Sequence, residues 1–221
     1  MKRVERAPTL ATAAAKNIRA GILRGELLPG APLHEVELSE ALNISRGTLR
    51  ETFRLLQSEG LVDIFPHRGA FVAKLSSKKV TEIYTLRALL ESYAVRLALQ
   101  KRAYTAADFQ KMKVLVKQLG ELEQTTGYAG SVEVDMQFHQ LVCHCCGHEL
   151  LLEMIGNLQS LTLMFILNTK LYQSDKQQDD VSHRAVLEAI LQGTPDAAEQ
   201  VVRQHIIDAG RSLVERMEES K

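Results

Sequence analysis

The sequence predicts a mainly α protein in which an N-terminal winged helix-turn-helix, residues 1–75, precedes an all-α bundle of about six helices, residues 76–221. Four of the five prolines lie at or before Pro66, and none lies between residues 67 and 194, so that stretch lacks the strongest helix breaker. Residues 1–79 hold 13 Lys and Arg against 8 Asp and Glu, whereas the remainder holds 14 against 19. These opposite balances indicate two tasks, and the basic segment suits a polyanion.

Composition indicates a globular protein of the cytoplasm. The chain is 45% hydrophobic and 24% charged, ordinary values for a domain with a core. No apolar run reaches the length of about 18 residues expected of a membrane span, and no signal-peptide core follows the charged N-terminus. Three cysteines within four positions (Cys143, Cys145 and Cys146) cannot form a disulfide framework, which fits a reducing compartment.

The first domain is predicted to contain three helices and a small β-hairpin wing. Apolar spacing places helices at about 9–25, 35–42 and 46–58. Ser45 is a good N-cap for the third helix, and Gly60 ends it. Apolar stretches at 61–65 and 70–72, separated by Pro66 to Gly69, predict the hairpin.

The third helix carries a basic stripe. Arg46, Arg50 and Arg54 are four residues apart and therefore share one side of the helix. Arginine can contact guanine in a bidentate way or clamp a phosphate, and Thr48 can bond to a phosphate or a base edge. By spacing alone, a solvated helix face explains the three arginines equally well.

The second domain is predicted to be helical throughout. The expected helices are 77–102, 105–125, 130–146, 148–169, 176–192 and 195–217. Asp135 and His139 lie four residues apart on one helix face, whereas His183 and His205 lie among apolar residues of later helices. Imidazoles with a carboxylate suit Zn²⁺, Ni²⁺ or Mn²⁺. Spacing alone leaves open that each histidine is an ordinary core or surface residue.

Two alternatives compete with a DNA-binding protein. The Asp and His set is compatible with a metal-dependent hydrolase, although no HExxH, GxSxG or Walker pattern occurs. The second alternative is a helical scaffold that binds only protein. The segment from Cys143 to His148 could hold a soft metal or sense oxidants, but no second cysteine pair exists, which favours buried thiols.

Residues 10–73 resemble the GntR family of bacterial regulators. The resemblance rests on Ile22 to Gly30, Leu38 to Arg46, Arg50-Glu51, Leu56 to Val62 and Gly69. It implies a DNA-binding regulator whose recognition helix and wing contact an operator through Arg46, Thr48, Arg50, His67 and Gly69. It also implies a homodimer on a pseudo-palindromic site of double-stranded DNA. Val36 departs from the pattern, because some members have an arginine there.

The second domain is similar to the FCD ligand domain of FadR-like GntR proteins. The matching segments are Leu86 to Glu91, Asp135 to His139, His183 to Ile190 and the late His205. The resemblance implies a divalent metal, most simply zinc, held by Asp135, His139, His183 and His205. A cation in a helical pocket favours a small organic acid as effector, and Arg87 is a candidate second clamp on its carboxylate. An i,i+4 pair with Glu91 is the equal alternative for Arg87. The expected function is therefore an effector-controlled regulator, in the first instance a repressor.

Overall fold

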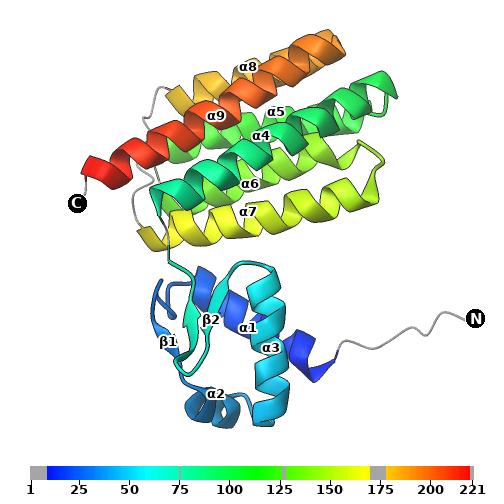
Figure 1. The fold of residues 1–221 in the computed structure, drawn as a ribbon. Helices are drawn as coiled ribbons and strands as arrows, with labels where there is room; N and C mark the ends of the chain where they lie inside the picture. The colour runs from blue at the N-terminus through cyan, green and yellow to red at the C-terminus, as the bar shows by residue number, and fades with distance from the viewer. Residues whose placement is uncertain (1–8, 75, 126–127, 170–177, 220–221) are drawn as a thin grey trace, which may run out of the picture. The chain divides into compact units, whose positions relative to one another are not determined.

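The computed structural model describes residues 9–74, 76–125, 128–169 and 178–219 (Figure 1). The chain divides into two compact units, residues 1–75 and 76–221. The prediction of a mainly helical chain with a small sheet near its N-terminus is confirmed. Among the described residues, no helix is both long and apolar enough to span a bilayer.

The first unit is a helix-turn-helix with a wing. Its helices are α1 (Leu10–Leu23), α2 (Glu35–Ala41) and α3 (Arg46–Ser58), and its strands are β1 (Pro32–Leu33), β2 (Val62–Phe65) and β3 (Gly69–Val72). The Ser45 hydroxyl caps α3 by accepting a hydrogen bond from the Thr48 backbone N–H at 3.1 Å. The apolar side of α3 packs on α1 through fully buried side chains, Ile22, Leu49 and Leu56 among them. This packing leaves the basic side of α3 outward.

The wing has one more strand than the sequence predicted. The hairpin of β2 and β3 forms as expected, but β1 pairs antiparallel with β3, so the strand order is β1-β3-β2. β1 is only two residues long and starts at Pro32, which cannot donate a ladder hydrogen bond. A strand this short has no alternating pattern for sequence analysis to detect.

The second unit contains six helices within its described residues. They are α4 (Ser77–Gln100), α5 (Ala106–Thr125), α6 (Tyr128–His144), α7 (Glu149–Thr169), α8 (Gln178–Gln192) and α9 (Pro195–Glu219). Their bounds follow the predicted spans closely; positions 176–177 of the fifth predicted helix lie outside the described residues. α4 packs along α9 and also contacts α6 and α7 (Figure 1).

A glycine sets the close approach of α4 and α9. A Cβ atom added at Gly210 would lie 2.5 Å from Cβ of Tyr84, a separation that real Cβ atoms do not show. Tyr84 therefore packs directly on the α9 backbone. This contact brings the next two turns of α4, with Arg87 and Glu91, against the interior of the bundle, where both are buried.

Candidate metal centre and nucleic-acid interface

The basic stripe predicted on α3 is exposed. Arg46, Arg50 and Arg54 all have exposed side chains, whereas Thr48 is half-buried and its hydroxyl lies 2.9 Å from that of Ser45. α3 thus separates an apolar side, which holds the helix in the unit, from a basic side that can approach phosphates and base edges.

Glu35 holds one of these arginines. Arg50 Nε donates to both carboxylate oxygens of Glu35 at 3.0 Å, and Arg50 Nη2 lies 3.0 Å from Oε2. The hydrogen bonds with Glu35 raise the pKa of Arg50, so the guanidinium is charged at any working pH. Sequence analysis did not single out Glu35, because the contact joins two helices.

The wing tip carries three exposed candidates. His67 and Gly69 have positive φ angles of 61° and 89°, so the turn projects the tip away from the strands. Arg68 between them lies over two aromatic rings, 5.6 Å from the centroid of Phe65 and 5.9 Å from that of Phe71. Sequence analysis omitted Arg68; its only signal was a cation between two nearby aromatic residues.

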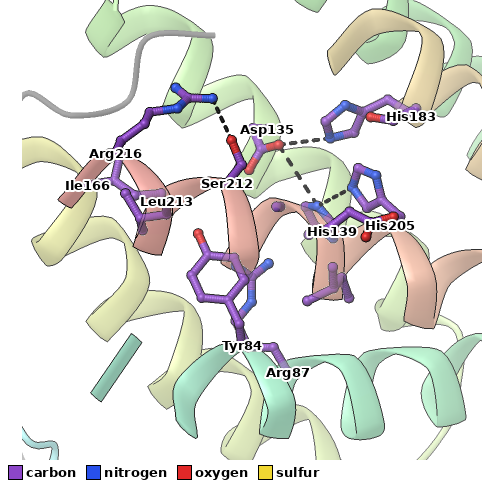
Figure 2. Close-up of a pocket in the computed structure, with 14 residues that line it drawn as sticks. Tyr84, Arg87, Asp135, His139, Ile166, His183, His205, Ser212, Leu213 and Arg216 are labelled. Atoms are coloured by element: carbon purple, nitrogen blue, oxygen red, sulfur yellow. Dashed lines mark hydrogen bonds and ion pairs between the residues drawn. The ribbon is translucent and has the colours of Figure 1, made fainter. Parts of the chain in front are cut away.

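The four predicted metal ligands converge from three helices. α6 supplies Asp135 and His139, α8 supplies His183, and α9 supplies His205 (Figure 2). One ring nitrogen from each histidine lies within 4.8 Å of the others, and Nε2 of His205 is 3.3 Å from Nε2 of His139. Asp135 Oδ1 is 2.8 Å from His183 Nε2 and 3.9 Å from His139 Nε2.

These donors fit a tetrahedral metal ion. Two Zn–N bonds of about 2.05 Å at the tetrahedral angle place their nitrogens about 3.3 Å apart, which agrees with the 3.3 Å between His139 and His205. Burial, together with His183 and His139, lowers the pKa of His205 well below its usual value, so the imidazole is neutral, the form that binds metals. The cluster could therefore hold a divalent cation.

Asp135 is the anionic member of the cluster. Burial by itself raises the pKa of this carboxyl, but the hydrogen bond from His183 and the electrostatic interactions with His139, His183 and Arg87 outweigh burial. The pKa of Asp135 therefore lies below its usual range, and the carboxylate is ionised. An ionised oxygen beside three imidazoles is the donor set expected for zinc or for nickel and manganese.

Arg87 makes the i,i+4 pair with Glu91 that was its alternative assignment. Arg87 Nε donates to Glu91 Oε1 at 2.7 Å, and the side chains are 3% and 0% exposed. Glu91 Oε2 lies 2.8 Å from Nδ1 of His139, a contact that is off the line of an ideal imidazole hydrogen bond. Arg87 also lines a cavity that the histidine cluster borders.

The cluster forms one end of a cavity of about 330 Å³. Ser212 and Arg216 of α9 line another part of its wall, and Arg216 Nη2 donates to the Ser212 hydroxyl at 2.8 Å (Figure 2). Tyr84 and Arg87 of α4 also line the cavity. Sequence analysis did not assign Tyr84, Ser212 or Arg216, because residues from two distant helices meet only in the fold.

No cysteine belongs to this donor set among the described residues. Cys143 and Cys146 are buried and Cys145 is half-buried. Burial is the main cause that raises the pKa of Cys143, well above its usual value, and that of Cys145. Both thiols are therefore protonated near neutral pH, which is the unreactive form. This observation favours the buried-thiol interpretation.

Comparisons with known proteins cover nearly the whole chain. Residues 10–72 match the family described as bacterial regulatory proteins, gntR family, and residues 82–208 match the FCD domain. The chain is 30% identical to the "Probable D-xylose utilization operon transcriptional repressor" of Paenarthrobacter nicotinovorans, across 84% of this chain and 80% of that protein. It is 28% identical to the "Glc operon transcriptional activator" of Escherichia coli strain K12, across 90% and 87%. Escherichia coli McbR/YncC shares the fold, with a TM-score of 0.75 at 20% identity over 95% of this chain and 99% of that one.

Proposed function

From the premise that this chain belongs to the GntR family of bacterial regulatory proteins and carries an FCD domain, we propose that it is a repressor controlled by a metal-bound carboxylate. Membership makes the chain a transcriptional regulator and not a hydrolase, since the family and the matched relatives are regulators. Its GntR segment implies DNA binding. The metal, the effector and the direction of regulation are the parts that we propose.

One observation carries the proposal. Three imidazole nitrogens from α6, α8 and α9 lie within 4.8 Å of one another, beside a carboxylate, in the wall of a cavity. Buried imidazoles that serve only packing have no reason to point their nitrogens at a common centre, because each nitrogen then competes for the same hydrogen-bond partners. A divalent cation at that centre would satisfy the three nitrogens and Asp135 together.

A small organic acid is the ligand that such a cavity favours. Zinc with one Asp and three His ligands can expand to five-coordinate, and nickel or manganese prefers more ligands still, so a carboxylate oxygen can complete the shell. The cavity of about 330 Å³ is at the small end of ligand sites. Arg216 and Ser212 in its wall offer a cation and a hydroxyl to polar groups on the rest of the molecule.

The proposed operator contacts are on α3 and the wing. Arg46, Arg50 and Arg54 are exposed on one side of α3, which would lie in the major groove with Thr48 at its first turn. His67 and Gly69 at the wing tip would contact the backbone or the minor groove. Arg68 joins this set, because its guanidinium is exposed between them.

The proposed repressor is a homodimer. A helix-turn-helix reads one half-site, so a palindromic operator needs two copies. α4 and α7 contact each other, and both leave large apolar side chains 43–62% exposed: Leu86, Leu89, Tyr93, Leu150 and Met154. A second copy would cover this face in an isologous way. Sedimentation tests this assignment. A wild type that sediments as a dimer and a Leu89→Glu variant that sediments as a monomer would support it. A Leu89→Glu variant that remains a dimer would contradict it.

A thermal-shift screen of organic acids tests the effector site. Zinc-loaded wild type, wild type treated with a chelator, and zinc-treated His183→Ala are melted with each acid. We expect at least one carboxylate to raise the midpoint of the zinc-loaded wild type only; a ligand at 100 times its Kd stabilises by about 2.7 kcal/mol. A carboxylate that stabilises all three samples equally would show that the ligand does not need the cluster.

A further inference from the structure

The fully buried carboxylate of Glu91 touches a proposed metal ligand but cannot itself reach the metal centre. We propose that Glu91 is a positioning residue that fixes the ring of His139 for metal binding, and that Arg87 acts through Glu91 instead of clamping the effector. This inference rests on the metal site proposed above. It concerns which side chains prepare that site and not which ion occupies it.

The two oxygens of Glu91 lie against different partners. Oε1 accepts from Arg87 Nε at 2.7 Å, one turn earlier on α4, and Oε2 lies 2.8 Å from Nδ1 of His139 on α6. The side chains of Glu91, Arg87 and His139 are 0%, 3% and 5% exposed, respectively, so water does not compete for these contacts. The chain of contacts therefore runs from Arg87 through Glu91 to the edge of the His139 ring that faces away from the cluster.

Such a contact selects the form of the imidazole. A carboxylate at Nδ1 favours the tautomer that carries its proton there, and this leaves the lone pair on Nε2. Nε2 is the nitrogen of His139 that lies 3.3 Å from His205 and 3.9 Å from Asp135. Glu91 thus points the donor atom of His139 at the common centre and increases its basicity.

Arg87 offsets the free-energy cost of burying the Glu91 carboxylate. An unpaired carboxylate in the core is costly, whereas an adjacent guanidinium offsets much of that cost. Arg87 Nε lies 2.7 Å from Glu91 Oε1, and both side chains are almost fully buried. The guanidinium carbon of Arg87 also lies 5.1 Å from the ring centroid of Tyr84, which holds it in place. Arg87 is therefore engaged on two sides by the protein itself.

Zinc affinity and the tautomer of His139 test the inference. The variants are Glu91→Gln, which keeps the shape and removes the charge, and Glu199→Gln, a control that removes an α9 carboxylate paired with Arg96 and Arg203. Zinc binding is measured by competition with a chelator of known affinity. The tautomer is measured in metal-free protein by ¹⁵N NMR of labelled histidine, with His139→Asn assigning the signal.

We expect Glu91→Gln to weaken zinc binding by about 10–100-fold and to shift His139 away from the Nδ1–H tautomer. Glu199→Gln should match the wild type in both measurements. Arg87→Gln should weaken zinc binding similarly, and the double variant should be little weaker than either single one, because both act along one line of contacts. If Glu91→Gln does not fold, Glu91→Asp withdraws the carboxylate and should give the same direction of change.

The outcomes separate this inference from the metal site. Wild type that binds zinc no better than His183→Ala would overturn the metal proposal, while the NMR result would still report on Glu91. Wild-type zinc affinity and an unchanged tautomer in Glu91→Gln would overturn the positioning role alone. Additive losses in the double variant would show that Arg87 acts independently of Glu91.

Discussion

Arg50 is held by its own protein at the surface proposed to contact DNA. Its bidentate contact with Glu35 fixes the plane of an otherwise flexible guanidinium. A fixed guanidinium suits a bidentate contact to guanine, whose acceptors have one geometry, better than a contact to a phosphate. The carboxylate also repels phosphates, so it should discourage binding to DNA of any sequence.

We therefore expect Glu35→Gln to reduce the discrimination between operator and non-operator DNA more than it reduces the affinity for the operator. Freed Arg50 should contact phosphates, so binding to non-operator DNA should strengthen and the slope of log affinity against log salt should steepen by up to about one unit. The measurement is the salt dependence of binding to operator and scrambled duplexes. Glu37→Gln, on the same turn of α2, is the matched control. Equal effects of the two variants would show that Glu35 acts only through its negative charge and not by holding Arg50.

At the level of elements, the α4–α9 pair holds the ligand cavity together. α4 contributes Tyr84 and Arg87 to the cavity wall, and α9 contributes His205, Ser212 and Arg216. The two helices approach closely because Gly210 faces Tyr84 without a side chain. Their packing therefore sets the distance between the α4 side of the cavity and its α9 side.

Gly210→Ala should destabilise the protein by about 1–3 kcal/mol, because the added methyl group overlaps the Tyr84 side chain and outweighs the helix propensity of alanine. The control is Gly156→Ala on α7, where an added Cβ meets nothing within 4 Å. That variant should be neutral or more stable by up to about 1 kcal/mol. Urea unfolding of both variants compares them. A stabilised Gly210→Ala would show that α4 and α9 are not in close contact.

The sequence predicts elements better than it predicts contacts between them. α4 to α9 lie close to their predicted bounds because proline is absent from residues 67 to 194, and α3 does so because Ser45 and Gly60 at its two ends are local signals. The pairing of β1 with β3, and of Glu91 with His139, depends on residues that meet only after folding. Residue type singled out the four proposed metal ligands, but only the family resemblance favoured them as one site, since the spacing of His183 and His205 carries no such information.

On the scale of the whole molecule, regulation requires the effector to distinguish two states. A ligand lowers operator affinity only if it binds the DNA-free state more tightly than the DNA-bound state, by about 1–3 kcal/mol for a typical coupling. α4 starts at Ser77, directly after the first unit ends, and lines the cavity through Tyr84 and Arg87. The same helix therefore lines the proposed effector cavity and continues the chain from the DNA-binding unit.

Operator affinity as a function of carboxylate concentration is the most direct test of this account. The titration uses the acid with the largest zinc-dependent thermal shift, with zinc-loaded wild type, chelator-treated wild type and zinc-treated His183→Ala. We expect the acid to weaken operator binding by about 5–150-fold in the zinc-loaded wild type and to leave the other two unchanged. Operator binding that falls equally in all three proteins, or in none, would contradict the claim that a metal-bound carboxylate controls this regulator.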